Sequence, residues 1–142
     1  MKYMTKTRLS VVLTALLLTG AAAFAQLNMP QPQADARKVA ATIDSTTTLR
    51  IILNAKFDER EELLTGIEAR VRTADSVLAG LTLPDSAKDE LKNASQALTE
   101  GIAKSRNATA DDWEKIRADL SDRYSAYAQA AVRAEEAASA AR

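Results

Sequence analysis

ADARKVAATIDSTTTLRIILNAKFDEREELLTGIEARVRTADSVLAGL, residues 34–81, carries a sustained heptad pattern of apolar residues. With Ala36 at position a, the a and d positions form an apolar seam that only Thr46, Arg50 and Arg60 interrupt. Such a repeat predicts an α-helix that packs against other helices. The seam positions are Ala36, Val39, Ile43, Thr46, Arg50, Leu53, Phe57, Arg60, Leu64, Ile67, Val71, Ala74, Leu78 and Leu81.

The length of this first helix decides how many helices the domain has. No Pro or Gly interrupts residues 34–65, and Gly80 is a typical residue just after a helix end. We therefore predict a continuous or merely kinked helix over residues 34–79, about 70 Å long at 1.5 Å per residue. The alternative is a break near residues 54–58, where Asp58 with Glu61 would cap a new helix. A continuous helix gives an antiparallel bundle of three long helices, and a broken one gives four.

Two further helices follow the turn that contains Pro84. The second is predicted at residues 85–105, with an inner face of modest size. Thr109 followed by Asp112 resembles a capping box, so the third helix is predicted from there almost to Arg142. The fold class is therefore all-α, a helical bundle over residues 34–142. The third helix has the apolar stripe Trp113, Ile116, Leu120, Tyr124, Tyr127, Ala131, Ala134, Ala138 and Ala141.

The first 25 residues have the pattern of a bacterial signal peptide. Lys2, Lys6 and Arg8 precede a short apolar run at residues 9–18, and Ala-Phe-Ala at residues 23–25 is a small-x-small cleavage pattern. We predict cleavage before Gln26, with an uncleaved membrane anchor as the alternative. Residues 26–33 are predicted to form an extended linker because they contain two prolines. The predicted location is the periplasm or the exterior of the cell, with no membrane span after cleavage.

The charge balance gives no reason to expect nucleic-acid binding. The whole chain has 19 basic and 19 acidic residues, and residues 1–25 contain three of the basic ones and none of the acidic ones. The exported part is therefore mildly acidic, whereas nucleic acid requires a concentrated basic surface. The chain also has no Cys, so packing, an oligomer or a partner must stabilise the domain in place of disulfides.

The residue types present exclude several catalytic chemistries. Without His or Cys, the chain lacks the commonest zinc, copper and haem ligands and cannot form a Ser-His or Cys-His nucleophile pair. Acidic residues at helix starts are favoured by the helix dipole, so we interpret the two acidic clusters as capping or solvated residues. We expect no enzyme activity, no metal and no cofactor. The clusters are Asp58, Glu59, Glu61 and Glu62, and Asp111, Asp112 and Glu114.

The segment TTTLRIIL, residues 46–53, is the strongest candidate for a contact surface. Ile51 and Ile52 fall at heptad positions b and c, away from the seam, so apolar residues surround the helix here. One interpretation is a surface for another subunit, a protein partner or an unfolded client. The other is a local kink that lets both helix faces reach the same core. The candidate contact residues are Leu49, Ile51, Ile52, Leu53 and Phe57.

These features favour two functions. The first is an exported, non-enzymatic binding protein, chaperone-like or stress-related, that acts through an exposed apolar helix surface. The alternative is a structural coiled-coil spacer of the cell envelope or an oligomeric scaffold, for which the length of the first helix matters. The expected partner is another protein or a second copy of the chain.

Overall fold

The computed structural model describes residues 38–142, so the predicted signal peptide at residues 1–25 and the linker at residues 26–33 lie outside the described residues. All regular structure within residues 38–142 is helical, which confirms the all-α fold class. The elements are α2 (Lys38–Ile43), α3 (Ser45–Asn54), the 3₁₀ turn η2 (Phe57–Glu59), α4 (Arg60–Ala79), α5 (Asp85–Arg106) and α6 (Trp113–Ala140).

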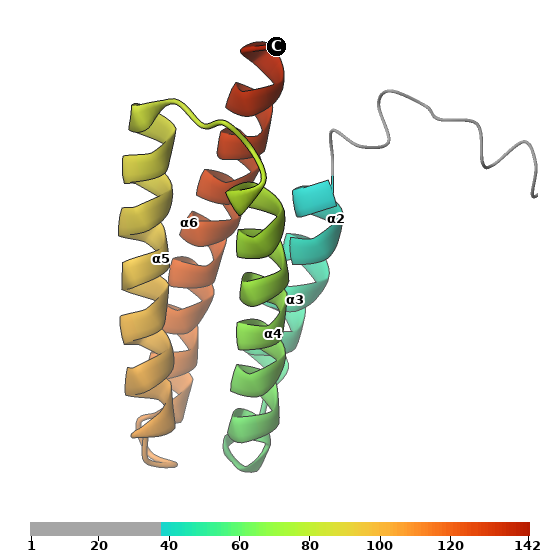
Figure 1. Cartoon of the computed structure of the whole chain (residues 1–142). Coiled ribbons are helices and arrows are strands. Elements are labelled where there is room, and N and C mark those ends of the chain that lie inside the picture. The colour runs from blue at the N-terminus through green and yellow to red at the C-terminus, as the bar shows by residue number, and fades with distance from the viewer. Residues whose placement is uncertain (1–37) are drawn as a thin grey trace, which may run out of the picture. The chain divides into compact units, whose positions relative to one another are not determined.

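The described chain forms an antiparallel bundle with four arms (Figure 1). Helices α2 and α3 follow one another as the first arm, and α4 returns beside it. Helix α5 then runs opposite to α4, and α6 returns to the end where α2 begins. Helix α6 contacts all the other α-helices, so it lies at the centre of the packing. The prediction of a continuous first helix with three arms is wrong, and the alternative break near residues 54–58 is confirmed.

An additional break at Asp44 separates α2 from α3. Asp44 has a φ of 36°, in the left-handed region that short polar side chains tolerate. Its carboxylate accepts a hydrogen bond from the backbone N–H of Thr47 at 3.4 Å and caps α3. The carbonyl of Ile43 accepts instead from the hydroxyl groups of Tyr124 at 2.7 Å and Thr48 at 3.2 Å. In a continuous helix this carbonyl would accept from the backbone N–H of Thr47. Here two side-chain hydroxyls replace that donor.

The break at Asp44 changes which face of the first arm is buried. Ile43 is buried as the heptad pattern predicts, but the next buried positions are Thr48 and Ile52. Thr48 lies five positions after Ile43, more than the three or four positions of a regular seam, because the helix restarts after Asp44. The seam prediction is therefore wrong at three positions, which are exposed: Thr46, Arg50 and Leu53.

The chain reverses between α3 and α4 at Ala55 and Lys56, which both have extended backbones. The carbonyl of Ala55 accepts hydrogen bonds from Nε1 of Trp113 at 2.8 Å and from Nη1 of Arg117 at 3.0 Å. The carboxylate of Glu59 accepts from the backbone N–H of Lys56 at 2.9 Å. The reversal is therefore capped by Glu59, not by the predicted pair Asp58 and Glu61, and is anchored to the start of α6.

The core is built from large side chains around the middle of α6 and from alanine towards its end. Leu120, Tyr124 and Tyr127 are fully buried, as the predicted stripe requires. Beyond Tyr127 the helix continues to Ala140 with its alanine face buried. Small side chains let the arms approach closely here, so the alanine-rich turns remain part of the bundle. The buried alanines are Ala128, Ala130, Ala131, Ala134 and Ala138.

Helices α5 and α6 approach so closely at Gly101 that a larger residue would displace Arg123. A methyl group at position 101 would lie 2.5 Å from Cδ of Arg123. Arg123 donates hydrogen bonds to the carbonyl of Ala97 at 2.7 Å and to the carboxylate of Asp119 at 3.0 Å. A methyl group at Gly66, in α4, would meet no atom within 4 Å.

These two glycines form a matched pair for a stability measurement. We expect Gly66→Ala to raise the free energy of unfolding by about 1 kcal/mol, because alanine is the better helix former. Gly101→Ala removes the same backbone penalty but displaces Arg123, so we expect it to be less stable than Gly66→Ala by about 1–3 kcal/mol. Urea unfolding followed by circular dichroism measures both. Equal stabilisation by the two substitutions would show that Arg123 does not constrain position 101.

Candidate functional site

The described surface is mostly polar, with two large apolar side chains that are strongly exposed. Ile51 is 46% exposed and Leu53 is 49% exposed, and both belong to α3. None of the helices in residues 38–142 combines the length and the apolar character that crossing a membrane requires. The two exposed apolar side chains make α3 the candidate contact surface.

The structure does not bring the five predicted contact residues together on one surface. Ile52 is fully buried, and Ile51 and Leu53 point to different sides of α3. Leu49 is half-buried in a separate shallow groove of about 300 Å³ against α6. Phe57 is half-buried beneath the guanidinium of Arg60, which lies 4.2 Å from the ring centroid. Of the five residues, Ile51 alone lines the hollow between α3 and α4 together with Leu63 and Ile67.

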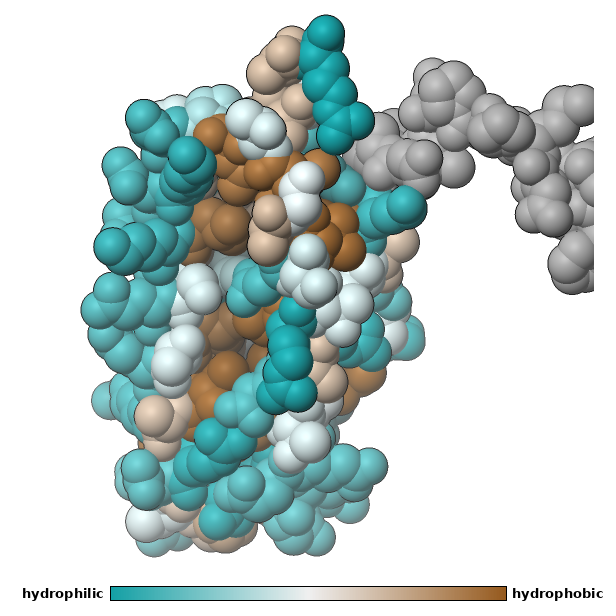
Figure 2. Space-filling view, in the orientation of Figure 1, coloured by the Kyte–Doolittle hydropathy of each residue, from teal (hydrophilic) through white to brown (hydrophobic). Residues whose placement is uncertain are grey.

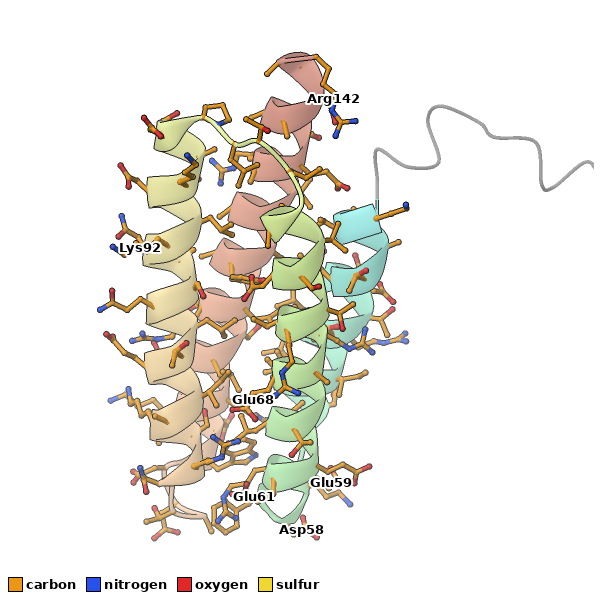
Figure 3. The ribbon with its side chains drawn as sticks, viewed as in Figure 1. Asp58, Glu59, Glu61, Glu68, Lys92 and Arg142 are labelled. Atoms are coloured by element: carbon orange, nitrogen blue, oxygen red, sulfur yellow. The ribbon has the colours of Figure 1, made fainter. Side chains whose placement is uncertain are left out.

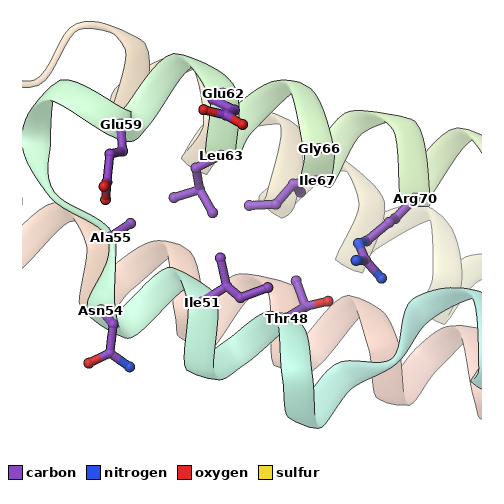
Figure 4. Close-up of a pocket in the computed structure, with 10 residues that line it drawn as sticks. All are labelled: Thr48, Ile51, Asn54, Ala55, Glu59, Glu62, Leu63, Gly66, Ile67 and Arg70. Carbon is purple, nitrogen blue, oxygen red and sulfur yellow. The ribbon is translucent and has the colours of Figure 1, made fainter.

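This hollow is a groove between α3 and α4, shown in Figure 4, which we call the α3–α4 groove. It has a volume of about 520 Å³ and is closed at one end by the turn that contains Ala55. Leu63 and Ile67 form its apolar floor and are themselves largely buried. Ile51 stands opposite them on α3 (Figure 4).

Gly66 keeps the α3–α4 groove open. It lines the groove in the middle of α4, and no atom lies within 4 Å of the position that its missing side chain would occupy. A guest side chain can therefore reach the floor between Leu63 and Ile67. The rim supplies charged groups of both signs and one neutral amide, from Glu59, Glu62, Arg70 and Asn54. The groove thus combines an apolar floor with a polar rim, as protein-binding surfaces commonly do.

A second groove runs along the other side of α4, between α4 and α5, and we call it the α4–α5 groove. It consists of two adjoining hollows of about 450 and 320 Å³ that share Asp75 and Ser95. Figure 2 shows apolar residues along this groove between the polar outer faces of α5 and α4. Its large apolar lining residues are Val71, Leu78, Leu83, Leu91, Leu98 and Ile102.

Two tyrosines tie α6 to the neighbouring arms. The hydroxyl of Tyr127 donates a hydrogen bond to the carboxylate of Asp75 at 2.6 Å, beside the α4–α5 groove. Burial, and next the hydrogen bond to Asp75, raises the pKa of Tyr127 well above its ordinary value. Burial also raises the pKa of Tyr124, whose hydroxyl donates to Ile43. Both phenols are therefore protonated donors at neutral pH, and their visible role is to hold the arms together.

The raised pKa values of the tyrosines predict a loss of stability in alkali. An unfolded tyrosine has a pKa of about 10, so above that pH the native state binds more protons than the unfolded state. The stabilisation is complete below about pH 10 and is lost as the pH rises towards the native pKa. Tyr124 and Tyr127 are the only tyrosines in residues 38–142, so phenolate absorbance reports them directly. Phenolate formation with a midpoint near pH 10 while circular dichroism remains native would contradict this assignment.

The acidic side chains of residues 38–142 do not gather into a metal-binding cluster. No group of three or more Asp or Glu side chains in this part of the chain lies close enough to hold a metal ion. Glu61 and Glu68 instead pair with Arg106 of α5, at 3.7 and 2.8 Å. The hydrogen bond and the charge of Glu68 raise the pKa of Arg106.

Comparison of the chain with protein-family models, with curated proteins and with solved structures gives no significant match. The two grooves are therefore the features of the described residues that bear on function.

Sequence reasoning found one wall of the α3–α4 groove and missed the other. The apolar run that contains Ile51 was visible, whereas the facing wall depends on Gly66 and Arg70, which the heptad pattern treats as outer positions. The α4–α5 groove was missed altogether. Its apolar residues look like ordinary core residues in the sequence, and Leu78, Leu98 and Ile102 are indeed buried. The half-buried residues of the lining are Val71, Leu83 and Leu91.

Proposed function

We propose that this chain is an exported, non-enzymatic binding protein that holds an apolar segment of another protein in the α3–α4 groove. The observation that carries the proposal is the groove itself, with half-exposed Ile51 facing an apolar floor across the open position at Gly66. The sequence pattern of a signal peptide at residues 1–25 supports export. The absence of His and Cys from the whole chain supports a non-enzymatic role.

The groove suits transient holding of an apolar segment. A volume of about 520 Å³ accommodates a few apolar side chains and not a whole folded partner. Burial of apolar surface contributes about 25 cal/mol per Å², so a contact this small binds weakly and releases readily. The polar rim formed by Asn54, Glu62 and Arg70 can donate to or accept from the backbone of an extended guest. These properties support a chaperone-like role.

The alternative of an envelope spacer has less support. It depends on a first helix of about 70 Å, which would extend beyond the rest of the bundle. The reversal at Ala55 and Lys56 returns the chain along α3, so the described bundle has no single helix of that length. The bundle therefore supports the holding of a partner better than a spacer role.

Ile51→Glu and Leu53→Glu make a matched pair that tests the proposal. The two residues are almost equally exposed on the same helix, but only Ile51 lines the α3–α4 groove. The assay is light scattering from a chemically reduced, aggregating model protein mixed with the chain from Gln26 onwards. We expect the unmodified chain and Leu53→Glu to suppress aggregation equally, and Ile51→Glu to lose the suppression.

Gly66→Leu tests the same groove by filling it. A Cβ at this position meets no atom of another segment within 4 Å, and the rest of a leucine side chain would extend into the groove in place of the guest. We expect this variant to fold normally and to lose holding activity. Equal holding by Gly66→Leu, Ile51→Glu and the unmodified chain would refute the proposal, as would the absence of any suppression by the unmodified chain.

A further inference from the structure

The α4–α5 groove is long enough to receive a helix. Helix α5 packs along α6, whereas α4 and α5 make far fewer contacts with each other. The lining extends along α5 from Lys88 to Arg106, which corresponds to about 27 Å at 1.5 Å per residue. A guest helix of about 18 residues has the same length. Figure 2 shows the groove open along the face between these two helices.

The floor of the α4–α5 groove favours an apolar helix stripe. Leu98 and Ile102 lie at its base, and half-buried Val71 and Leu91 stand higher on its two walls. Ser95 lines both hollows, and a small side chain there lets a guest approach α5 closely. The groove is open to solvent along its length, so an apolar stripe on one face of a helix can enter while the opposite face stays hydrated. This geometry is the helix-in-groove mode of recognition.

The charges along the α4–α5 groove favour an acidic guest. Its lining contains four basic residues and two acidic ones, whereas residues 38–142 as a whole have 15 basic and 18 acidic residues. Glu68 is paired with Arg106, and Lys88 is paired with Asp85. The carboxylate of Asp75 accepts a hydrogen bond from the neutral hydroxyl of Tyr127 and keeps its charge, which leaves the two unpaired cations of the lining in excess. Figure 3 shows Glu68 between α4 and α5.

Two of the lining cations have no bound carboxylate in the described part of the chain. Arg72 of α4 and Lys92 of α5 stand on opposite rims of the groove, and neither makes an ion pair with another described residue. Lys92 lies at the outer edge of α5 (Figure 3). A helix lying between these rims would meet a positive charge on each side of its apolar stripe.

We propose that the α4–α5 groove binds an amphipathic helix of a partner protein whose apolar stripe is flanked by acidic residues. The helix would lie on the apolar floor between α4 and α5, with its carboxylates beside Arg72 and Lys92. It would complete the bundle as a fifth arm. This site is separate from the α3–α4 groove, because α4 stands between the two.

The test uses two labelled synthetic peptides of about 18 residues. Both have the same leucine stripe, flanked by glutamates in one and by lysines in the other. Fluorescence anisotropy with the chain from Gln26 onwards measures their affinities. We expect the glutamate peptide to bind at least about tenfold more tightly than the lysine peptide at low salt, and less so at high salt.

Charge reversal and groove filling locate the peptide. We expect Arg72→Glu combined with Lys92→Glu to weaken binding of the glutamate peptide about tenfold and to improve binding of the lysine peptide. Ser95→Trp should abolish binding of both by filling the groove. Ile51→Glu, in the α3–α4 groove, should leave binding unchanged, so failure here is distinguishable from failure of the proposed function.

Three outcomes would overturn the inference. Equal affinity for the two peptides would remove the role of charge. Binding that survives both the charge reversal and Ser95→Trp would place the peptide elsewhere. Binding to vesicles of anionic lipid that is lost on charge reversal, without binding of the glutamate peptide, would assign the cations to a membrane surface.

Discussion

Replacement of Trp113 by alanine should lower the free energy of unfolding by about 3–5 kcal/mol. Trp113 is 4% exposed, and its indole N–H donates to the carbonyl of Ala55 in the reversal between α3 and α4. Its ring also meets that of Phe57 edge-on, with the centroids 6.4 Å apart. The substitution removes apolar burial, a ring contact and a hydrogen bond at one point. Small domains are stable by only about 5–15 kcal/mol, so we expect a large drop in the urea midpoint.

Trp113→Phe separates the ring from its hydrogen bond. Phenylalanine keeps most of the buried surface but cannot donate to Ala55, whose carbonyl still accepts from Arg117. We therefore expect a smaller loss of about 1–2 kcal/mol. If the alanine variant were no less stable than the phenylalanine variant, burial of the indole would not be what holds the reversal in place.

Loss of both hydroxyl donors at the α2–α3 break should destabilise the protein more than the sum of the single losses. Tyr124 and Thr48 both donate to the carbonyl of Ile43, which accepts from no other donor within residues 38–142. We expect Tyr124→Phe and Thr48→Val each to cost about 1 kcal/mol. The double variant should cost about 3–5 kcal/mol, because only then does the buried carbonyl lose every donor.

A double-mutant cycle measures this coupling. All four proteins are unfolded in urea under the same conditions, and the coupling is the excess of the double variant over the two single ones. Tyr127→Phe serves as a matched control, because Tyr127 is equally buried but donates to Asp75 on another arm. It should be additive with Thr48→Val. Additivity in the Tyr124 pair would show that the carbonyl is satisfied in some other way.

The helical character of the chain and most of its core were predictable from the sequence. Most of the predicted stripe of α6 is buried where periodicity places it, but Ile116 is half-buried and Ala141 is exposed. Helix α5 ends within one residue of its predicted end. Long periodic segments without Pro or Gly predict a helix well, because every apolar residue in them falls on the same helix face.

The two breaks in the first arm were harder to predict because neither contains Pro or Gly. Asp44 adopts a left-handed backbone supported by a distant tyrosine, and Ala55 is held in its extended conformation by donors from α6. Both supports are about 60 to 80 residues away along the chain. The polar residues Thr46 and Arg50 at seam positions were the only local sign that a different face of α3 is buried after Asp44. Tertiary contacts therefore determine the backbone conformation at both Asp44 and Ala55.

The candidate surface was only partly predictable for the same reason. The exposure of Ile51 and the burial of Ile52 follow from the rotation of α3 after Asp44, which the sequence pattern did not contain. The space beside Gly66 depends on how far α3 stands from α4. Grooves between helices are properties of interhelical distance, and residue type alone does not report that distance.

Helix α4 forms a wall of both grooves and therefore has open space on two sides. Among the long helices, we expect its backbone amides to exchange with deuterated solvent sooner than those of central α6, since few packed contacts mean a small free energy of local opening. A guest in either groove would slow that exchange. Because both guests would then order the same helix, each would improve the affinity of the other by an equal factor.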